Sequence, residues 1–508
     1  MATDLVIGID SSTSATKAIA WDGGGKAIAE GRAPIAMSNP APGQFEQDPA
    51  EWWGSTASAL QQLAAKIDVK RVAAIGISNQ RETFGIFSAD GQALRPGMVW
   101  LDERAKPQYR RFGQTFGSER VHAISGKPLD VIPPIYRMLW LQEHEAELFR
   151  RADKITEVHG YLTHKLTGNW TTSTASADPM GALDMRKKEW SREILDAVGV
   201  DARKMLALAA PGTQTGELIR DAAAVTGLPA GIPVIAGGGD GQCAGTGAGV
   251  SADHPERAYV NLGTALVSGS YGRNYAHNLA FRTEVAIADD GYIFETCMRS
   301  GTFLVDWLTQ VLGTERNGKR ELIAALEAEA KQSPIGSNGV MIVPYWQGCM
   351  NPYWDSSARG VIVGLSGSTR RGDIYRAFLE GMALEQATAT DEVEKATGIP
   401  IETFIAIGGG AASDFWVQIV ADITGKPVQR SETVEASSLG AAIAAAKGAG
   451  WHKSIAEAGA AMAGEPVRTF EPDPKRHARY EQLRAMHAEL WPKLAAWNQR
   501  LVDFTEQA

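Results

Sequence analysis

Apolar runs that end in short polar turns recur along this chain. Residues 5–9 form one such run, which ends at Asp10, and residues 17–21 form another after the turn Ser11 to Ser14. Short apolar runs bounded by turn residues are typical of buried strands. The pattern therefore predicts a β-hairpin whose tip is acidic and rich in hydroxyl groups.

The same plan appears again in the second half of the chain. Residues 258–262 predict a strand, Gly263 and Thr264 a tight turn, and residues 265–268 a returning strand. Two related hairpins so far apart in one sequence indicate two lobes of similar design.

Two further strands are predicted to run into glycine turns and then into helices. The run 234–236 is followed by residues 237–242, Gly-Gly-Gly-Asp-Gly-Gln, which contain Asp240. The run 404–407 is followed by Gly408, Gly409 and Gly410, with a helix expected near Ser413. Glycine lets backbone and ligand approach closely, and a strand-to-helix turn gathers amide donors for anions.

A carboxylate in such a turn needs a reason to be there. We interpret Asp240 as a group that abstracts a proton beside a phosphate, whereas the alternative is that it only caps the following helix.

Near the C-terminus, apolar residues recur at steps of three and four, which predicts an amphipathic helix that packs on the second lobe and that Pro492 bends. The predicted apolar face consists of Tyr480, Leu483, Met486, Leu490, Leu494, Trp497 and Leu501.

Composition agrees with a globular protein of two domains. The chain has 508 residues, of which 44% are hydrophobic and 21% charged, and 508 residues exceed what one core normally supports. The formal charge of −9 argues against a nucleic-acid partner. Three separate cysteines suit a reducing compartment, and there is no leader and no apolar stretch of ~18 residues. These features predict a cytoplasmic protein with no membrane partner.

The motifs together resemble the FGGY family of carbohydrate kinases over nearly the whole chain. The resemblance is carried by GIDSSTSATKAIAW from Gly8, EQDPAEWW from Glu46, IGISNQRETFGIF from Ile75, VWLDERA from Val99, GGGDGQCAGTGAG from Gly237, YVNLGTALVSG from Tyr259, VPYWQGCMNPYWDSSARGVIVGL from Val343 and IGGGAASDFWVQIVADITGKPV from Ile407.

This resemblance implies an α/β fold with two ribonuclease-H-like lobes, as in actin and hexokinase, around a central cleft. We expect an N-terminal sugar-binding lobe over residues 1–250 and a nucleotide-binding lobe over residues 251–450. Residues 451–508 are expected to form a helical extension packed on the second lobe. The resemblance also allows a homodimer.

For the family's reaction, ATP and Mg²⁺ are the expected cofactors and a small sugar or polyol the substrate. The resemblance implies that Asp10 holds Mg²⁺ through water and that Asp240 also lies at the metal. The expected nucleotide-binding residues are Ser11, Ser12, Thr13, Lys17, Gly263, Thr264, Gly408, Gly409, Gly410 and Ser413. Ser12 departs from the family pattern, which has glycine before the threonine.

Phosphoryl transfer needs the nucleotide held, its charge neutralised and the acceptor hydroxyl aligned and deprotonated. Asp240 is the expected catalytic base, and an ordinary carboxylate suffices because the proton can leave late in a loose transition state.

Residues on the sugar side resemble two kinds of relative. Gln80, Arg81 and Glu82 resemble the glycerol-kinase clamp for polyol hydroxyls. By contrast, Ile132 stands where glycerol kinase has tyrosine, and Gly241 where relatives have Gln or Asn. These smaller groups predict a roomier pocket.

The hydrogen-bonding side chain that relatives carry directly after Asp240 is then either absent or supplied by Gln242. Trp100 is expected to wall the sugar and Asp102 to accept from a hydroxyl. The segments 160–185 and 237–249 resemble xylulokinase more closely. A ketopentose such as D-xylulose is thus the first choice of substrate, and glycerol or another polyol the alternative.

Two other classes fit the sequence less well. The turn from Gly239 to Ala244 fits a dinucleotide-binding pattern, but Asp240 would face the pyrophosphate and no acidic residue follows at the required distance. A non-catalytic ATPase module, like actin or a chaperone, would not need Arg81, Glu82 and Asp240 together.

Overall fold

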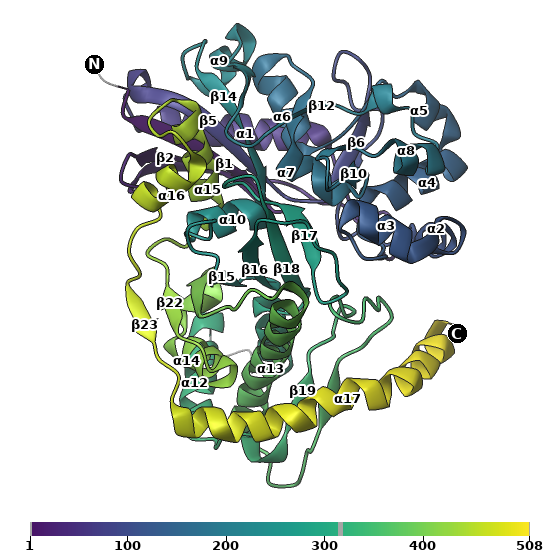
Figure 1. Ribbon diagram of the computed structural model, residues 1–508, viewed down its shortest axis with the longest axis vertical. Helices are drawn as coiled ribbons and strands as arrows, with labels where there is room; N and C mark the ends of the chain where they lie inside the picture. Colours follow the sequence, from purple (N-terminus) through teal and green to yellow (C-terminus); the bar gives the residue numbers. More distant parts are fainter. Residues whose placement is uncertain (1–2, 313–317, 507–508) are drawn as a thin grey trace.

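The computed structural model describes residues 3–312 and 318–506, which fold into two lobes stacked along the long axis of the molecule (Figure 1). Each lobe is built on a mixed β-sheet with helices packed against it. The expected pair of α/β lobes is therefore confirmed.

The two large sheets can be given in spatial order. The first consists of β13 (Gln214–Glu217), β14 (Pro233–Gly239), β5 (Val72–Asn79), β1 (Leu5–Ser11), β2 (Ala15–Asp22) and β3 (Ala27–Pro34). The second consists of β17 (Arg282–Val285), β18 (Tyr292–Met298), β16 (Leu266–Gly272), β15 (Arg257–Leu262), β21 (Thr403–Ile407), β22 (Val428–Arg430) and β23 (Arg468–Phe470).

Both sheets share one topology. In each sheet, three adjacent strands are antiparallel to one another (β1-β2-β3 and β15-β16-β18). On its other side, the first of these strands is adjacent to two strands that run parallel to it (β5-β14 and β21-β22). The two predicted hairpins are β1–β2 and β15–β16, so the internal resemblance between distant segments is confirmed.

Smaller sheets complete the strand inventory. They are β4 (Glu46–Gln47), β7 (Gly97–Met98), β6 (Phe84–Phe87) and β8 (Lys154–Glu157) in one sheet, and the pairs β9 (Thr171–Ser173) with β12 (Ala207–Ala209), β10 (Leu183–Asp184) with β11 (Glu189–Trp190), and β19 (Met341–Val343) with β20 (Val361–Val363).

Seventeen α-helices lie in the described part of the chain. They are α1 (Pro49–Ala64), α2 (Lys106–Phe112), α3 (Ser118–Ser125), α4 (Pro134–His144), α5 (Ala146–Arg151), α6 (Val158–Thr167), α7 (Thr174–Ala177), α8 (Arg192–Ala197), α9 (Arg220–Thr226), α10 (Asp240–Gly247), α11 (Thr302–Leu312), α12 (Lys319–Ala330), α13 (Arg371–Thr397), α14 (Asp414–Thr424), α15 (Ala436–Gly448), α16 (Ile455–Met462) and α17 (Pro474–Glu506).

Helix α15 packs against the first sheet, although it follows the second sheet's strands in sequence. Its Ser438 hydroxyl donates to the carbonyl of Gly8 at 2.9 Å. A Cβ at Gly8 would lie 1.9 Å from the Ser438 carbonyl oxygen, and one at Gly76 would lie 2.0 Å from that of Ala441. Glycine in these strands therefore permits a close helix-on-sheet approach.

This packing differs from the division predicted from the sequence, in which the second lobe ends at residue 450. Both α15 and the following α16 lie with the first lobe (Figure 1), and β23 joins the second sheet as an edge strand. The segment after residue 450 is thus neither wholly helical nor wholly placed on the second lobe. The small residues of α15 explain its position, because they let it be buried between layers.

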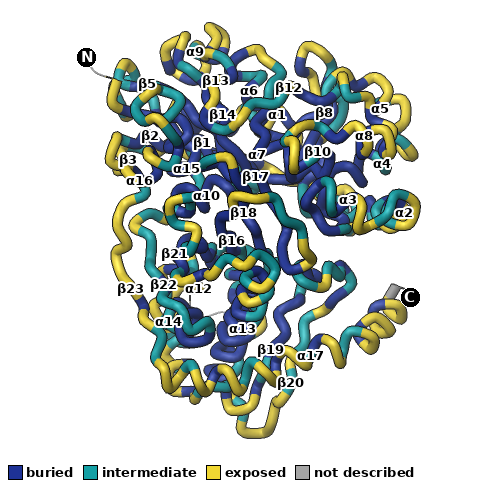
Figure 2. The backbone as a smooth tube through the Cα atoms, viewed as in Figure 1, coloured by how far each residue is buried: buried dark blue, intermediate teal, exposed yellow. Residues whose placement is uncertain are grey.

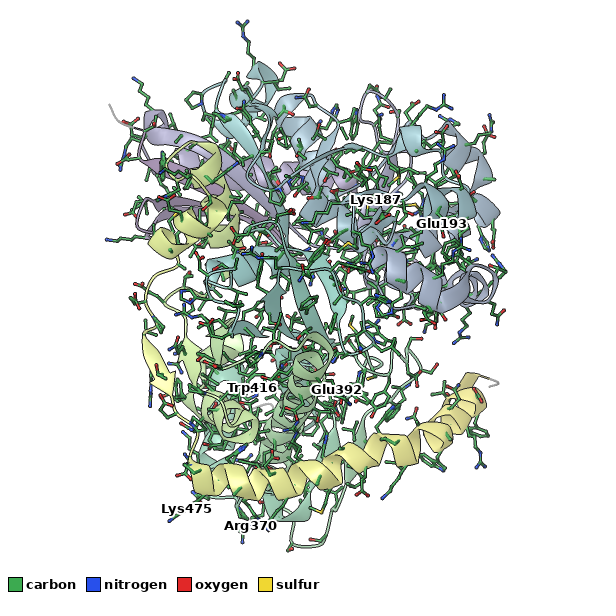
Figure 3. All side chains as sticks on the ribbon, viewed as in Figure 1. Lys187, Glu193, Arg370, Glu392, Trp416 and Lys475 are labelled. Carbon is green, nitrogen blue, oxygen red and sulfur yellow. The ribbon has the colours of Figure 1, made fainter. Side chains whose placement is uncertain are left out.

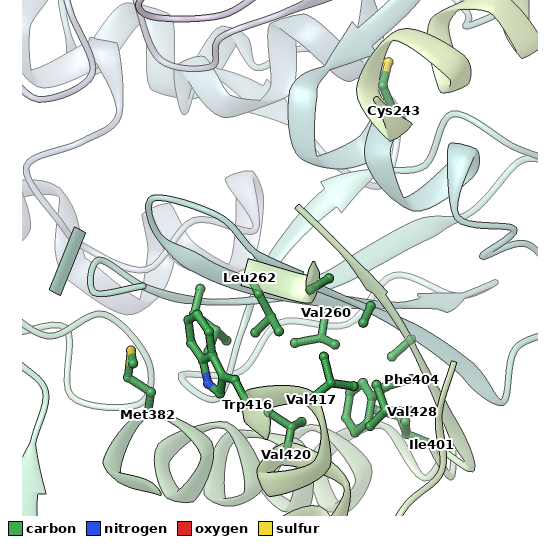
Figure 4. Packing of buried hydrophobic residues seen from close by; sticks show 14 of the residues in the cluster. Cys243, Val260, Leu262, Met382, Ile401, Phe404, Trp416, Val417, Val420 and Val428 are labelled. Atoms are coloured by element: carbon green, nitrogen blue, oxygen red, sulfur yellow. The ribbon is translucent and has the colours of Figure 1, made fainter. Parts of the chain in front are cut away.

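The core of the second lobe lies between its sheet and helices α13 and α14. Figure 4 shows Val260 and Leu262 of β15 facing Trp416 and Val417 of α14. The burial map shows the strands of both sheets as the most buried part of the molecule (Figure 2). The turns at the strand ends are thereby held on a rigid framework.

The buried side of the last helix, α17, differs from the predicted apolar face. Tyr480 is buried, but Met486, Trp497 and Leu501 are exposed, whereas Trp491 is buried instead. Because the helix carries apolar residues on several sides, the surface formed by α13, α14 and β19 decides which side is covered.

Charged side chains cover the outside of both lobes, as the labelled Lys187, Glu193, Arg370 and Lys475 show (Figure 3). None of the helices in residues 3–312 and 318–506 combines the length and the apolar character that a bilayer crossing requires.

Candidate active site

Three parallel strands of the first sheet bring the predicted catalytic residues together. Strands β1, β5 and β14 are neighbours, and their carboxyl ends carry Asp10, then Gln80 and Arg81, then Asp240. Because adjacent strands lie about 4.8 Å apart, these side chains share one edge of the sheet. Ligands of α/β proteins bind at such edges.

Asp240 opens α10 directly after the last residue of β14, as predicted. Its Oδ1 accepts the Nε–H of Arg81 at 3.0 Å and the backbone N–H of Gly241 at 2.8 Å. Oδ2 has no hydrogen-bond partner among the described residues, and 40% of the side chain is exposed. The carboxylate is thus fixed through one oxygen and open through the other.

The helix-capping alternative for Asp240 accounts for little of this geometry. The residue in the N-cap position is Gly239, and Asp240 lies inside the first turn. Its only amide contact is with its neighbour Gly241, whereas the Arg81 contact orients the side chain towards the strand ends.

Asp10 is a buried carboxyl beside Asp240. Burial and then the charge of Asp240 raise the pKa of Asp10 to about 7, whereas the charge of Lys17 and a hydrogen bond from Ser78 oppose this shift. A cation between Asp10 and Asp240 would relieve both effects. This donor set fits a hydrated divalent ion, for which oxygen ligands are preferred.

No cluster of three or more His, Cys, Asp or Glu side chains suited to a metal occurs in the part of the chain that the structure describes. An ion at Asp10 and Asp240 would therefore take its remaining ligands from water or from a bound phosphate.

The tip of the β1–β2 hairpin is held by side chains from outside it. The indole N–H of Trp100 donates to the Thr13 hydroxyl at 2.9 Å, and the Gln47 amide donates to the Thr13 carbonyl at 2.6 Å. Gln80 donates to the Gln47 amide oxygen at 3.0 Å, and its backbone N–H donates to Ser11 at 2.8 Å. Gln80 is consequently buried beneath the tip, where it supports the hairpin.

The rest of the hairpin tip is arranged for backbone contacts. The Ser12 hydroxyl donates to the carbonyl of Ala15 at 2.8 Å, which tightens the turn in which the family pattern has glycine. Lys17 forms an ion pair with Glu435, the residue before α15. Lys17 therefore links the hairpin to α15 through an ion pair.

On the second lobe, the two predicted glycine turns lie against each other. A Cβ at Gly408 would lie 2.2 Å from Asn261 Oδ1 and 3.1 Å from the backbone nitrogen of Gly263. Gly408 also has a φ of 81°, a conformation that favours glycine. Thr264 and Gly409 are exposed beside this contact. The turns thus form one surface at the ends of β15 and β21.

Gly410 and Ser413 have structural roles in this surface. A Cβ at Gly410 would lie 2.5 Å from the Trp416 ring. The Ser413 hydroxyl accepts the backbone N–H of Trp416 at 3.1 Å as the cap of α14 and donates to Glu327. Its side chain is therefore committed to the fold, in contrast to the predicted nucleotide contact.

Arg81 and Glu82 are bound to the second lobe. Arg81 Nη1 donates to both carboxylate oxygens of Glu295 on β18, at 3.1 and 2.9 Å. Arg282 on β17 donates to Glu82 at 2.6 Å and to Glu295 at 2.7 Å. All four side chains are buried. The expected polyol clamp is here part of an ion-pair network between the lobes, which we call the cross-lobe network.

Glu82 also has an unusual backbone. Its φ is 56°, in the left-handed region that residues other than glycine seldom adopt. Arg137 donates to its carbonyl at 2.6 Å, which holds this conformation in place. Burial raises the pKa of Glu82, although Arg282 and Arg81 oppose the shift.

The cross-lobe network continues to Glu284, Lys127 and Asp178. Burial alone would raise the pKa of Glu284, but Lys127, Arg282 and Arg81 outweigh it and lower the pKa. Burial and the charge of Glu284 raise the pKa of Asp178. For Glu295, Arg81 and Arg282 likewise outweigh burial and lower the pKa. Glu284 and Glu295 are therefore the ionised partners of the buried cations.

Three sugar-side predictions are wrong in this structure. Asp102 is fully buried, with both oxygens bound to Arg104 and one to the backbone N–H of Phe45 at 2.8 Å. Gln242 is also fully buried, and its amide donates to the Ala175 carbonyl at 2.8 Å. Asp102 has no group free for a substrate, and the Gln242 amide oxygen, which has no hydrogen-bond partner among the described residues, is buried.

The third concerns the extra room expected from Gly241 and Ile132. A Cβ at Gly241 would lie 2.7 Å from Glu295 Oε2 and 2.9 Å from Arg81 Nη2. The space is therefore filled by that ion pair. Ile132 packs against Met350 of the second lobe and also lines the cleft between the lobes.

A cleft of about 310 Å³ lies between the lobes, within the size range of sites for small molecules. Trp100, which faces this cleft, also anchors the hairpin tip. Arg299 of the second lobe reaches across to Asp130 at 3.1 Å. The lining residues are Gly43, Phe45, Trp100, Leu101, Glu103, Lys106, Val131, Ile132, Arg299, Gln347, Ser356 and Arg359.

No role was predicted from the sequence for Gln47, Glu295, Arg282, Glu435 or Arg299. A signal was present for two of them, because Glu295 directly follows the apolar run 292–294 and Arg282 directly follows Ala280 and Phe281. Such residues are rarely buried without partners. The identity of those partners depends on the fold.

Comparison with known proteins places this geometry in a family. Residues 5–247 match the N-terminal domain of the FGGY family of carbohydrate kinases, and residues 244–449 match its C-terminal domain. The chain is 29% identical over 506 residues to a xylulose kinase of Bacillus subtilis, covering 98% of this chain and 99% of the relative.

Two further likenesses extend this result. A glycerol kinase of Paenarthrobacter aurescens is 29% identical, with 98% of each chain covered. The crystal structure of a ligand-bound xylulose kinase from Lactobacillus acidophilus superposes with a TM-score of 0.91 at 25% identity, covering 98% of this chain and 99% of the other. With both domains matched over nearly its full length, the chain belongs to the FGGY family of carbohydrate kinases.

Proposed function

We propose that this kinase transfers the γ-phosphoryl group of ATP to a hydroxyl of a small neutral sugar, with a ketopentose such as D-xylulose as the preferred acceptor. The observation that carries the proposal is the half-open carboxylate of Asp240. It is oriented by Arg81 at the carboxyl edge of the sheet, and its second oxygen remains available to a hydroxyl.

In this proposal Asp240 accepts the proton of the acceptor hydroxyl as the new phosphorus–oxygen bond forms. The hairpin tip at Ser11 to Thr13 presents backbone amides and hydroxyls to the phosphates from the first lobe. The turns at Gly263 and Gly408 do so from the second lobe, and Gly409 flanks the adenosine. Positioning and charge neutralisation supply most of the rate enhancement in such reactions.

Asp10 and Asp240 would hold Mg²⁺, with Asp10 acting through a water molecule. The ion supplies charge neutralisation for the phosphates when bound. The support is the pKa of Asp10, which burial and the charge of Asp240 raise to about 7, since a divalent cation would favour the ionised form.

The cross-lobe network favours a neutral sugar over two alternatives. A polyol clamp would need free groups on Arg81 and Glu82, but both are ion-paired with the second lobe. A sugar acid would meet one carboxylate more than cations beside Asp240, whereas the cleft lining carries the cations Lys106, Arg299 and Arg359 and the carboxylate Glu103. Beside Asp240, the network sets Glu82, Glu284 and Glu295 against Arg81, Arg282 and Lys127.

The test is Asp240→Asn, measured by sugar-dependent ADP formation over a panel of D-xylulose, glycerol and gluconate. We expect kcat to fall by about 10²–10⁴-fold, the usual contribution of a positioned base. ATP affinity, measured by calorimetry without Mg²⁺, should change little because the proposed contacts of the nucleotide itself do not include Asp240. The parent protein should prefer D-xylulose by kcat/KM.

Three outcomes would contradict the proposal at different levels. Near-normal turnover by a folded Asp240→Asn protein would remove Asp240 as the base. A tenfold preference of the parent for glycerol, only ~1.4 kcal/mol, would replace the ketopentose by a polyol. ADP release that ignores every sugar would favour a non-catalytic ATPase module.

A further inference from the structure

The space beside Gly241 is occupied by a carboxylate from the other lobe. Glu295 Oε2 and Arg81 Nη2 lie where a side chain at position 241 would begin, at 2.7 and 2.9 Å from an ideal Cβ. A Cβ this close would force the Glu295 carboxylate or the Arg81 guanidinium to shift. The absence of a side chain at Gly241 is therefore a condition for the Arg81–Glu295 pair.

Glu295 holds Arg81 in one orientation. Its two oxygens lie 3.1 and 2.9 Å from Arg81 Nη1, and its side chain is 0% exposed. Tyr259 donates to Oε2 at 2.9 Å and Arg282 donates to Oε1 at 2.7 Å. With four donor contacts in a buried site, the carboxylate has little freedom to move. Charge-assisted hydrogen bonds of this kind are stronger than neutral ones.

Arg81 transmits this orientation to the base. While Nη1 is bound to Glu295, Nε donates to Asp240 Oδ1 at 3.0 Å. The guanidinium is planar and rigid, so fixing one edge fixes the direction of the other. Glu295 lies on β18 of the second sheet, whereas Asp240 follows β14 of the first. The second lobe thus sets the direction of a carboxylate on the first.

We propose that Glu295 is a positioning residue for phosphoryl transfer, which acts through Arg81 to aim the free oxygen of Asp240 at the acceptor hydroxyl. Gly241 serves the same function by leaving room for the pair. This inference rests on the proposed role of Asp240 as the base. It adds a residue in the other lobe that touches neither sugar nor nucleotide.

The test is Glu295→Gln, which keeps size but removes the charge that holds Arg81. We expect kcat to fall about 10- to 100-fold, the effect of a small misplacement of a catalytic group, with the KM values for sugar and ATP within about threefold of the parent. A loss of kcat without a rise in KM is the signature of misaligned chemistry.

The matched control is Glu380→Gln. Glu380 is another buried carboxylate of the second lobe that accepts from an arginine and a tyrosine, Arg376 at 2.7 Å and Tyr480 at 2.8 Å. It joins α13 to α17, away from the strand ends. The Glu380→Gln variant should lower the melting temperature as much as Glu295→Gln does, but it should leave kcat unchanged.

A second variant tests the same link without changing charge. Gly241→Ala places a Cβ against Glu295 and Arg81 and should reproduce the loss of kcat. The double variant Gly241→Ala with Glu295→Gln should be no worse than the poorer single variant, because both break one link. The Gly241 variant also keeps the test decisive if Glu295→Gln does not fold.

The outcomes separate this inference from the proposed function. If Asp240→Asn is inactive while folded Glu295→Gln and Gly241→Ala variants turn over within about threefold of the parent, the positioning role is wrong and the base is retained. If the losses of kcat caused by Gly241→Ala and Glu295→Gln add in the double variant, Gly241 and Glu295 act independently and the inference is overturned. If Asp240→Asn is active, the proposed function itself is wrong.

Discussion

Asp10 shows how one buried carboxyl couples stability to function. Burial and the charge of Asp240 raise its pKa to about 7, against about 3.9 for an unfolded aspartate. At pH values between these two pKa values, Asp10 loses its proton in the unfolded chain but keeps it in the folded chain. The free energy of unfolding therefore falls as the pH rises through this range. Above the range, Asp10 makes it neither rise nor fall further.

Asp10→Asn should remove this pH dependence. We expect the variant to be more stable than the parent by roughly 1–3 kcal/mol at pH 8, with a smaller difference at pH 5, because the amide carries no charge to bury. Urea unfolding of both proteins at the two pH values, without Mg²⁺, measures this. Sugar kinase activity should nevertheless fall, since the group proposed to hold the ion is lost.

A parent that is more stable than Asp10→Asn at pH 8 would contradict this account. It would show that the Asp10 carboxylate stabilises the fold through its contacts with Ser78 and Lys17, rather than being held for a ligand.

At the level of elements, the β1–β2 hairpin tip is the clearest unit. Strand pairing fixes the hairpin, but its tip is oriented by Gln47, Gln80 and Trp100 from other segments. These contacts orient the tip without any ligand, and we propose that it binds phosphates, for which preorganised donors are the effective ones. Trp100 connects this tip to the cleft between the lobes.

Trp100→Phe should therefore affect the nucleotide more than the sugar. An aromatic ring remains, although a smaller one, but the hydrogen bond to the Thr13 hydroxyl is lost, at a cost of about 1 kcal/mol. We expect the KM for ATP to rise about fivefold, the equivalent of that energy, with little change for the sugar. Steady-state kinetics with each substrate varied in turn decide this.

The opposite pattern would be informative. A rise in the sugar KM alone would show that Trp100 mainly walls the sugar, as the sequence first indicated.

At the scale of the whole molecule, the two lobes are joined on one side and open on another. The cross-lobe network and the packing of α10 against β15 and β16 form the joined side. The cleft of about 310 Å³ lies between the lobes, where Arg299 reaches Asp130. Such an arrangement allows rotation of one lobe against the other about the joined side.

Sugar and nucleotide together should therefore close the lobes and exclude water from the γ-phosphoryl group. Small-angle scattering should show a smaller radius of gyration with sugar and a non-hydrolysable ATP analogue than for the free protein. Each ligand alone provides the control. An unchanged radius with both sites saturated would argue against closure as the catalytic gate.

The sequence by itself determined the strands, their turns and the position of Asp240 at a strand end. Apolar runs that end in glycine or hydroxyl residues are local signals, and the two hairpins β1–β2 and β15–β16 follow from them directly. Because the motifs also carry the family resemblance, the kinase class and the two-lobed fold were predictable before any coordinates.

Only the tertiary structure decided which side chains meet. The partners of Arg81 and Glu82 are Glu295 and Arg282, about 200 residues away in the chain. The same holds for Asp102, which accepts the backbone N–H of Phe45, and for the space at Gly241, which Glu295 fills. Buried charges must be paired, but a one-dimensional pattern does not specify with what, since the pairing depends on how two separately formed sheets are packed together.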